Sequence, residues 1–425
     1  WLLKRVSAQC NKINSLIKLI IMQRKKLTIR VYGFGCVGQG LYDVLSRTQG
    51  LKVHIKKIGI KDATKTRNLP AHYFTTNRGE ILFDPEIDVV VELINDEHAA
   101  FEIVSTALRN GKAVVSASKK MIANNLNTLY ALQQQYQVPL LYEGACCASI
   151  PIIRNLEEYY DNDLLNSVEG IFNGSTNYIL TKIFNENKSF IQALSEAQEL
   201  GFAETDPTMD IEGFDPKFKL CILLLHAFGL FIQPEHIFNF GINRINDFDI
   251  NYAKEKHSSI KLLAKCRKVD NAVYAYVLPH FVNGNTQLTN IHNEYNGVIV
   301  ESAFADKQFF VGKGAGSTPT GSAVLSDISA LSYDYRYEYR KTSQLLAKQA
   351  QNDLKFADTL ALDNNLHLKV YVRCKNQAIV PLTDFIEIIE KYESTEQQYI
   401  IGIINLATII ASEWVKNEDI NLVVL

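Results

Sequence analysis

Apolar residues in the first third of the chain form short unbroken runs that alternate with stretches of helical periodicity. The first run, LTIRVYG (27–33), leads into a glycine turn and then into a helical pattern. Runs of this kind are typical of strands that are buried on both faces of a parallel sheet. Helical stretches at 97–110 and 121–136 separate the later runs, so the alternation predicts a Rossmann-type doubly wound α/β sheet. The further runs are VHIKKIGI (53–60), DVVVELI (88–94), AVVSAS (113–118) and PLLYEGA (139–145).

The pattern changes after Pro151. The stretch NSVEGIFNGSTNYIL (166–180) predicts a strand, a polar turn and the start of a helix. Two later stretches, 272–280 and 297–305, alternate in polarity, which predicts a mixed or antiparallel sheet with one open face. A second glycine-rich turn runs into a helix at 311–328. The last stretch predicts a small α/β module, with HLKVYVRC (367–374) as a strand, FIEIIEKYE (385–393) as a helix, YIIGIINLA (399–407) as a strand or helix, and INLVVL (420–425) as a closing strand.

Composition narrows the class of protein. The chain has 425 residues and a net charge of −2, which gives no global attraction to nucleic acid. Its seven cysteines show no CxxC spacing, so we expect reduced thiols in a cytoplasmic protein. The apolar segment at 16–21 is interrupted by Lys18 and is too short to span a membrane. We interpret Met22 as the natural start and the first 21 residues as upstream sequence.

The glycine turn GFGCVG (33–38) sits between a predicted strand and a predicted helix. In that context glycines allow a tight turn and a close approach to a pyrophosphate, which the helix N-terminus binds through its amides. The second strand ends in KDATKTR, where Lys61, Lys65 and Arg67 surround a single acid, Asp62. Three cations suit the 2′-phosphate of NADP better than the free ribose of NAD, so we expect NADP, with NAD as the alternative. A solvated charged loop is the competing interpretation.

The stretch EGFDPKFKL (212–220) places an acid, a proline and two lysines at the start of an apolar helix. Asp215 is expected at the N-cap and Pro216 at the first helical position, where no N–H donor is needed. Lys219 lies four residues after Asp215 and therefore on the same face. A helix N-terminus lowers the pKa of a lysine, and such a lysine exchanges protons near neutral pH. The competing interpretation is that Asp215 only caps the helix and pairs with Lys219.

From Met22 onward the chain resembles homoserine dehydrogenases. The resemblance is carried by GFGCVG (33–38), SASKK (116–120), EGACCASIPII (143–153), GIFNGSTNYIL (170–180), GFAETDPTMDIEGFDPKFK (201–219) and GKGAGSTPTGSAVLSD (312–327). That family interconverts L-homoserine and L-aspartate 4-semialdehyde with a nicotinamide cofactor, on the route to threonine, methionine and isoleucine. An acid-rich pocket suits a substrate that carries an α-ammonium group, and an alkoxide formed by hydride transfer needs an adjacent proton donor.

The resemblance implies roles for individual residues. Lys219 would give and take the proton, Asp215 would position the reacting group, and Lys119 would reach the cleft from the fourth strand. Substrate contacts are implied for Glu204, Asp210, Lys119, Gly174 and Thr176. Cofactor contacts are implied for Gly33, Gly35, Cys36, Val37, Gly38, Lys61, Arg67, Asn95, Ser118, Lys119 and Gly316. A monovalent cation such as Na+ is implied in the turn of Glu143, Cys146, Ala148 and Ile150.

The stretch ELINDEHAA (92–100) departs from the family pattern, with Asn95 and Asp96 in place of small residues. Asp96 would repel a cofactor phosphate if it faced one.

The resemblance also suggests the organisation of the chain. We expect an extension at 1–24, a Rossmann domain at 25–150 with a helix at 318–345 packed back on it, a catalytic and dimerisation domain at 151–317, and an ACT-like module at 350–425. The module either binds an amino-acid effector or only supports dimerisation, and we expect a homodimer or higher oligomer. The alternatives are a reductase of another amino-acid semialdehyde, or a catalytically inactive NADP-binding regulatory protein.

Overall fold

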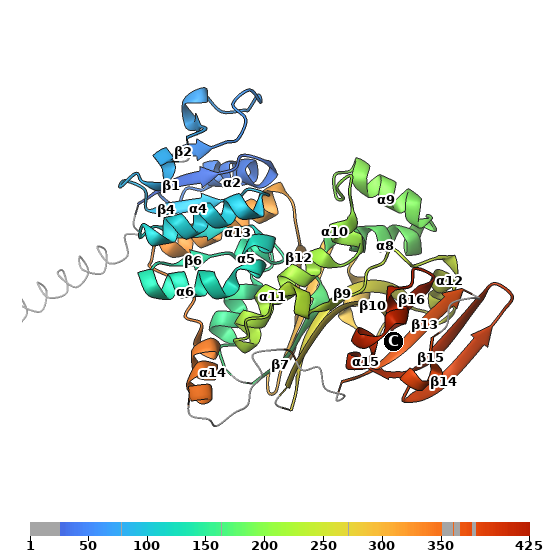
Figure 1. The fold of residues 1–425 in the computed structure, drawn as a ribbon. Coiled ribbons are helices and arrows are strands. Elements are labelled where there is room, and N and C mark those ends of the chain that lie inside the picture. The colour runs from blue at the N-terminus through green and yellow to red at the C-terminus, as the bar shows by residue number, and fades with distance from the viewer. Residues whose placement is uncertain are drawn as a thin grey trace, which may run out of the picture.

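The computed structural model describes residues 26–77, 79–162, 164–270, 272–350, 360, 366–375 and 380–425 (Figure 1). The expected extension at 1–24 lies outside the described residues. Two sheets organise the chain, and they correspond to the two regions that the hydrophobic pattern separates at Pro151.

The first sheet has six parallel strands in the order β3-β2-β1-β4-β5-β6, which confirms the predicted doubly wound fold. The strand order reverses at β1, with β2 and β3 on one side of it and β4 to β6 on the other, so a crevice forms at the carboxyl ends of β1 and β4. The four predicted strands after the first one are present, and the two-residue edge strand β3 was not predicted. The bounds are β1 (Leu27–Tyr32), β2 (Val53–Gly59), β3 (Phe74–Thr75), β4 (Val89–Glu92), β5 (Ala113–Ser116) and β6 (Leu140–Leu141).

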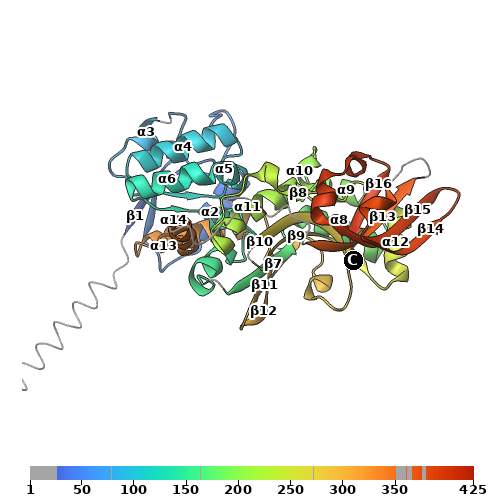
Figure 2. The same cartoon turned by 60° about the horizontal axis from the view of Figure 1, so that its bottom comes forward.

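Helices cover both faces of this sheet, with α4 and α6 on one side and α13 on the other (Figure 2). Helix α13 packs on α2 so closely that a Cβ added at Gly321 would lie 2.5 Å from the backbone of Gly40. The stretch predicted as one helix at 121–136 is two helices, α5 and α6, and the helix expected at 318–345 is broken at 332–339 into α13 and α14. The bounds are α2 (Cys36–Arg47), α3 (Gly79–Leu82), α4 (Glu97–Arg109), α5 (Lys119–Asn124), α6 (Leu126–Tyr136), α13 (Ser317–Leu331) and α14 (Arg340–Ala350).

The second sheet is mixed, as the polarity pattern predicts, with the strand order β12-β11-β7-β9-β10-β16-β13-β15-β14 and β8 paired to β10. The open polar face expected on 272–280 is absent, because β10 is buried along nearly its whole length. Tyr274, Tyr276 and Leu278 pack against residues of the C-terminal strands, while Val273 and Val277 join the main core. The bounds are β7 (Leu165–Ile171), β8 (Phe238–Asn239), β9 (Ser259–Val269), β10 (Ala272–Val282), β11 (Tyr295–Ser302) and β12 (Asp306–Lys313).

The C-terminal strands extend this second sheet. The stretch predicted as a helix at 385–393 is instead β14, because its backbone pairs with β15 and leaves its side chains mostly exposed. The strands run in the order β16-β13-β15-β14 and are antiparallel, as in a split βαβ unit. The first crossover of this unit carries only a short 3-10 helix, Leu382–Asp384, in its described part. The bounds are β13 (His367–Lys375), β14 (Glu387–Glu393), β15 (Gln397–Asn405), α15 (Leu406–Ala411) and β16 (Ile420–Val424).

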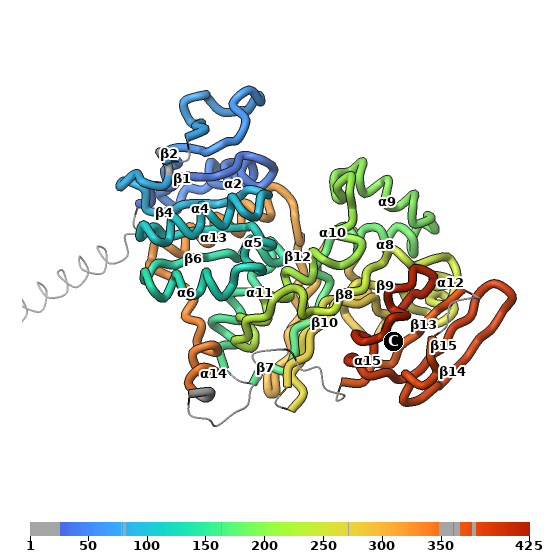
Figure 3. The backbone as a smooth tube through the Cα atoms, in the orientation of Figure 1, coloured from blue at the N-terminus to red at the C-terminus, as the bar shows by residue number. Residues whose placement is uncertain are grey.

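The helices of the middle region connect the two sheets. Helix α11 lies between α5 of the first region and strands β7, β9 and β10 of the second sheet (Figure 3), and it is buried almost throughout. In the part of the chain that the structure describes, no helix is long and apolar enough to cross a bilayer. The bounds are α7 (Ile152–Arg154), α8 (Gly174–Glu186), α9 (Phe190–Glu199), α10 (Thr208–Ile211), α11 (Phe214–Phe228) and α12 (Asp247–Glu255).

Candidate active site

The start of α11 differs from the sequence prediction. The N-cap is Gly213, with φ at +85°, and Asp215 and Pro216 lie inside the first turn. Only glycine adopts such a φ without strain, so the chain turns here from α10 directly into α11. Because Asp215 is not needed as a cap, its side chain is free to pair with other groups.

Two lysines converge on the carboxylate of Asp215. The Lys219 Nζ lies 2.8 Å from Asp215 Oδ2, and Lys119, at the start of α5, forms an ion pair with Oδ1. Lys219 also donates to the carbonyl oxygen of Phe172, at 2.6 Å. Asp215 and Lys219 are buried, whereas the Lys119 side chain is 42% exposed. The structure thus joins residues that are about one hundred positions apart in sequence.

This pairing sets the charges of the site. Burial alone would raise the pKa of Asp215, but Lys119 and Lys219 hold it well below its ordinary value. Burial likewise lowers the pKa of Lys219, yet the charge of Asp215 raises it further, so the net pKa is above its ordinary value. The prediction that the helix N-terminus lowers the pKa of this lysine is therefore wrong. Lys219 is an ammonium at neutral pH, with a carboxylate as its counter-ion.

A residue that the sequence analysis missed, Asn173, links the acids. Its Nδ2 donates to Asp210 at 2.6 Å and to Asp215 at 2.9 Å, while its Oδ1 accepts from the Thr176 amide at 2.8 Å. The last bond caps α8 and fixes the orientation of the amide. Burial and the nearby Asp215 raise the pKa of Asp210. An asparagine directly before the helix start in FNGST was the signal available in the sequence.

The remaining predicted substrate residues fall into two groups. Gly174 and Thr176 lie in the first turn of α8, beside Asn173, and Gly174 packs against the backbone of Glu294. The side chain of Glu204 is exposed on the loop before α10, and only its carbonyl oxygen accepts a hydrogen bond, from Gln198. The structure therefore does not bring Glu204 into contact with the buried acids.

Lys217 points away from this group. Its Nζ donates to Asn239 Oδ1 at 2.8 Å, and burial lowers its pKa. Because Lys217 is buried and hydrogen-bonded, we expect its replacement to lower the stability of the fold.

The glycine turn at 33–38 has the geometry of a dinucleotide-binding turn. Gly33 has φ at +97°, and a Cβ added there would lie 2.6 Å from the carbonyl oxygen of Leu93. A Cβ at Gly38 would lie 2.4 Å from the carbonyl oxygen of Gly33, whereas Gly35 faces open space. Cys36 and Val37 begin α2, so their amides lie at the helix N-terminus where a pyrophosphate binds. The turn therefore fits the pyrophosphate of a dinucleotide.

Asp96, which departs from the family pattern, lies directly before helix α4. Its carboxylate accepts from the Ala99 amide at 3.0 Å and caps α4, and that bond holds its pKa below the ordinary value. Asn95 and Lys61 line a cavity of about 460 Å3 with Asp96, beside the end of β2. Arg67 lines a neighbouring cavity, and its guanidinium donates to the carbonyl oxygens of Asp62 and Lys65.

Two further loops border the crevice. Ser118 follows β5 and donates its amide to Ser116 Oγ at 3.1 Å. Ser116 in turn contacts Glu92, a buried acid that the sequence analysis did not name; the two oxygens lie 2.5 Å apart. Burial raises the pKa of Glu92 to about 7. On the other side, Gly316, with φ at +118°, precedes α13, whose Ser317 donates to the carbonyl oxygen of Cys36 at 2.7 Å.

The turn after β6 buries the carboxylate of Glu143. Its two oxygens accept from the amides of Ile153, at 2.8 Å, and Arg154, at 3.0 Å. Burial and the nearby Asp327 raise its pKa to about 8. The following turn contains Cys146, Ala148 and Ile150, all buried, and Ala148 has φ at +39°.

Known proteins are similar to this chain in sequence. Two family models match, the NAD-binding domain of homoserine dehydrogenase over residues 33–143 and homoserine dehydrogenase over residues 151–329. The homoserine dehydrogenase of Bacillus subtilis is 34% identical over 321 residues, which cover 73% of this chain and 74% of that protein. The chain belongs to the homoserine dehydrogenase family. The Helicobacter pylori homoserine dehydrogenase is 34% identical over 313 residues, 72% of this chain and 73% of that one.

Solved structures of the family extend the match to the C-terminal strands. The homoserine dehydrogenase of Thiobacillus denitrificans superposes with a TM-score of 0.81 at 29% identity, covering 94% of this chain and 98% of that one. The Staphylococcus aureus enzyme at pH 7.5 gives 0.69 at 27% identity, covering 94% and 97%. A hyperthermophilic archaeal mutant in complex with NADPH, at 23% identity and a TM-score of 0.63 over 74% of this chain and all of that one, shares the fold.

As a homoserine dehydrogenase, the protein is a nicotinamide-dependent oxidoreductase that acts on a CH–OH group. It interconverts L-homoserine and L-aspartate 4-semialdehyde in the biosynthesis of threonine, methionine and isoleucine.

Proposed function

We propose that Lys219 is the proton donor and acceptor of this homoserine dehydrogenase and that Asp215 and Lys119 complete its catalytic group. The supporting observation is the pairing of both lysines with one buried carboxylate. An ammonium has three N–H groups, and Lys219 uses two of them on Asp215 and Phe172, so one remains for a substrate oxygen.

The proposed chemistry follows from the charge of Lys219. When bound, the reduced nicotinamide supplies a hydride to the aldehyde carbon. As that C–H bond forms, the electron pair of the C=O π bond moves to the oxygen, and Lys219 gives this oxygen a proton. Asp215 stays ionised throughout, because Lys119 still pairs with its other oxygen. In the reverse direction the neutral amine of Lys219 takes the hydroxyl proton.

For the substrate's α-ammonium we propose Asp210, whose orientation Asn173 fixes, together with Glu204 after movement of its exposed loop. Gly174 and Thr176 would border the same pocket from the start of α8. Acids near an ammonium group give charge-assisted hydrogen bonds, which are stronger than neutral ones.

For the cofactor we propose NADP in preference to NAD. The glycine turn, Asn95, Ser118, Lys119 and Gly316 would hold the dinucleotide along the crevice. Lys61 is the better-placed cation for a 2′-phosphate, because Arg67 already donates to two carbonyl oxygens of its own loop.

We further propose a monovalent cation such as Na+ in the turn of Glu143, with carbonyl oxygens of Cys146, Ala148 and Ile150 as ligands. The buried carboxylate of Glu143, whose pKa is raised to about 8, suits a cation, because the cation would offset its negative charge. Melting curves in sodium chloride and in choline chloride at equal ionic strength check this, and identical curves would contradict it.

The proposed assembly is a homodimer or higher oligomer in the cytoplasm, with the C-terminal strands as an ACT-like module that binds an amino-acid effector. Ile386, Ile388, Ile389 and Tyr392 are exposed along the edge strand β14, where a second chain would cover them. All six cysteines that the structure describes are free thiols, as in reducing compartments. Light scattering at micromolar concentration tests the assembly, and a monomer would contradict it.

A matched pair of lysines tests the catalytic proposal. Lys119→Ala removes one partner of Asp215, whereas Lys120→Ala removes a surface lysine that pairs with Glu97 at 3.2 Å. We expect Lys119→Ala to lower kcat/KM for homoserine by at least tenfold and Lys120→Ala to change it less than twofold. Equal effects of the two changes would contradict the proposed role of Lys119.

A further inference from the structure

A buried cluster of aromatic and charged side chains lies at the C-terminal end of α11. Its centre is His226, whose imidazole is fully buried. His226 Nδ1 lies 2.6 Å from Glu157 Oε1, and His226 Nε2 lies 2.9 Å from the hydroxyl oxygen of Tyr142. Two further tyrosine rings pack on the imidazole, with centroids at 4.9 and 5.6 Å. We refer to these five residues as the anchor cluster: Tyr142, Glu157, His226, Tyr337 and Tyr339.

The members of the anchor cluster come from segments that connect the two sheets. Tyr142 follows β6 of the first sheet. Glu157 lies in a single π-helical turn, Asn155–Tyr159, on the way to β7 of the second sheet. Such turns are rare and often occur at functional sites. The other two tyrosines belong to the break at 332–339, after which the chain continues to the C-terminal strands. His226 therefore joins α11 to two crossings of the chain between the sheets.

Every polar atom of the His226–Glu157 pair has a partner. Glu157 Oε2 accepts from the amide of Tyr339 at 3.1 Å. Burial opposes the ionisation of Glu157, but the charge and hydrogen bond of His226 hold the pKa of this acid below its ordinary value. The carbonyl oxygen of His226 accepts from Lys341 at 2.7 Å, which places a cation at the C-terminal end of α11, where the helix dipole favours it. Because hydrogen bonds are directional, these contacts fix both the position and the rotation of the helix.

The same helix carries the proposed catalytic residues at its other end. His226 follows Lys219 by seven residues, or about two turns, so both side chains lie on one face of α11. Helix α11 packs against α5, whose first residue, Lys119, pairs with Asp215. A shift or rotation of α11 at His226 therefore moves Asp215 relative to Lys119.

We propose that Tyr142, Glu157 and His226 are positioning residues for the dehydrogenase reaction, and that they hold α11 so that Asp215 stays paired with Lys119. This inference rests on the catalytic group proposed above. A misplacement of about 1 Å, caused by a change far from the chemistry, lowers an enzyme's rate by up to about 10²-fold. Loss of the anchor cluster should therefore lower kcat by about 5- to 100-fold.

Two conservative changes test the anchor cluster. Glu157→Gln removes the charge with little change of shape, and Tyr142→Phe removes only the hydroxyl beside His226. Steady-state kcat for homoserine oxidation should fall by about 5- to 100-fold in Glu157→Gln and at least threefold in Tyr142→Phe. The affinity for the reduced cofactor, measured by its fluorescence, should stay within twofold, because the glycine turn at 33–38 lies outside the cluster. An unchanged affinity also shows that the variants are folded.

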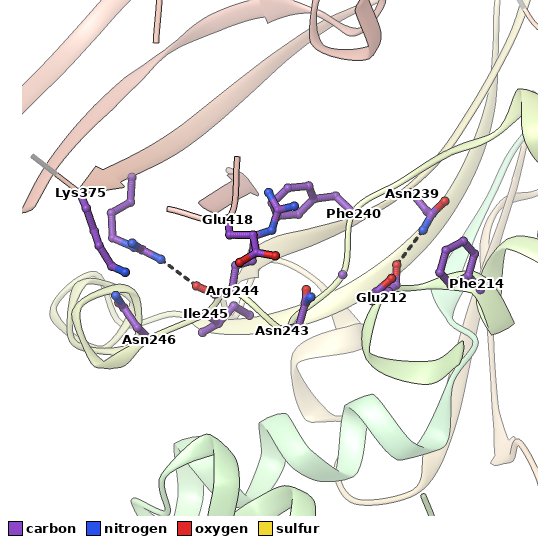
Figure 4. A pocket seen from close by; sticks show the side chains of 12 residues that line it. Glu212, Phe214, Asn239, Phe240, Asn243, Arg244, Ile245, Asn246, Lys375 and Glu418 are labelled. Atoms are coloured by element: carbon purple, nitrogen blue, oxygen red, sulfur yellow. Dashed lines mark hydrogen bonds between the residues drawn. The ribbon is translucent and has the colours of Figure 1, made fainter. Parts of the chain in front are cut away.

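A second buried cluster supplies matched controls. Asp249 pairs with Arg373 at 2.8 Å and accepts from the hydroxyl of Tyr371 at 3.1 Å. Arg373 lines a cavity of about 690 Å3 between the segment 239–246 and the C-terminal strands (Figure 4). Among the described residues that line this cavity, none belongs to the proposed catalytic group, substrate pocket or cofactor site. Asp249→Asn and Tyr371→Phe should therefore lower the stability to urea, as the two anchor changes do, but leave kcat within twofold.

The decisive measurement repeats the two anchor changes in the Lys119→Ala background. If the anchor cluster acts by keeping Asp215 paired with Lys119, removal of Lys119 leaves no pair to position. The anchor changes should then lower kcat less than twofold further, since residues that act as a unit are not additive. A general loss of stability would instead add to the effect of Lys119→Ala.

Three results would overturn the proposal. Glu157→Gln keeps kcat within twofold of the parent, or Asp249→Asn lowers kcat equally, or the anchor changes add fully to Lys119→Ala. The result for Lys119→Ala alone separates this proposal from the catalytic one. If that variant keeps full activity, the proposed catalytic group is refuted and the anchor role falls with it. If that variant is impaired while Glu157→Gln is not, only the anchor role is refuted.

Discussion

Replacing Lys219 with methionine removes the proposed proton carrier and keeps a side chain of similar length. A positioned acid or base contributes about 10²- to 10⁴-fold to rate. We therefore expect kcat to fall by that factor, which corresponds to roughly 3–5 kcal/mol of activation free energy at about 1.4 kcal/mol per tenfold. The KM for homoserine should change much less, because the proposed ammonium site at Asp210 is intact. Steady-state rates from the absorbance of the reduced cofactor measure both constants.

The same change has a predictable cost in stability. Removing one partner of a buried ion pair commonly costs about 3–5 kcal/mol when the other charge is left uncompensated. In this protein Asp215 keeps its ion pair with Lys119 and its hydrogen bond from the Asn173 side chain. We therefore expect a smaller loss of unfolding free energy, about 1–3 kcal/mol. Urea unfolding without cofactor checks this value.

A second buried lysine supplies the control. Lys261 on β9 donates to Asn177 Oδ1 at 2.8 Å and to the carbonyl oxygen of Ile291 at 2.6 Å, and burial lowers its pKa to about 7. Lys261→Met should leave kcat within about threefold of the parent while still perturbing the fold. The role of Lys219 is refuted if Lys219→Met keeps kcat within threefold, or if Lys261→Met lowers kcat equally.

Three further outcomes follow from the charges of the site. Changing both Lys61 and Arg67 to alanine should weaken the binding of NADP far more than the binding of NAD, and Lys61 should account for most of the effect. Equal losses of affinity for the two cofactors would show that both residues only belong to a solvated charged loop. Because the pKa of Lys219 is raised, homoserine oxidation, which needs its neutral amine, should accelerate as the pH rises towards that raised pKa, while aldehyde reduction should not; parallel profiles would argue against this. Burial raises the pKa of Glu92 in the folded chain from 4.5 to about 7, so the ionised carboxylate destabilises the fold. This destabilisation is absent below pH 4.5 and complete above about pH 8. Glu92→Gln should therefore stabilise the chain by up to roughly 3 kcal/mol at pH 8 and by nothing at pH 4.5, and a pH-independent difference in unfolding free energy would contradict this.

The sequence predicts the first sheet well because parallel strands are buried on both faces and leave uninterrupted apolar runs. The prediction fails at 385–393, where isoleucines and glutamates fit both a helical and a strand pattern. Pairing of this segment with β15 makes it a strand. The prediction also fails on the burial of β10, since most of the residues that pack with Tyr274, Tyr276 and Leu278 come from 368–424, about ninety or more positions later. Local spacing placed Asp215 and Lys219 together, but only the family resemblance suggested Lys119. The sequence does not single out Asn173, because the pattern of a helix-capping asparagine is the same whether or not its side-chain amide also bridges two acids.

The position of Lys119 explains why two lysines share one aspartate in the proposed reaction. Lys119 follows β5 at the cofactor edge of the first sheet, whereas Lys219 lies on α11 against the second sheet. When Lys219 gives up its proton, the buried carboxylate of Asp215 loses a charged partner. This loss would cost several kcal/mol, roughly 3–5, if Asp215 had no other cation beside it. The ion pair with Lys119 keeps the carboxylate neutralised during this step. Since Lys119 follows a strand of the first sheet and Lys219 lies on a helix that packs against the second, the proposed catalytic group is complete only when those regions pack together.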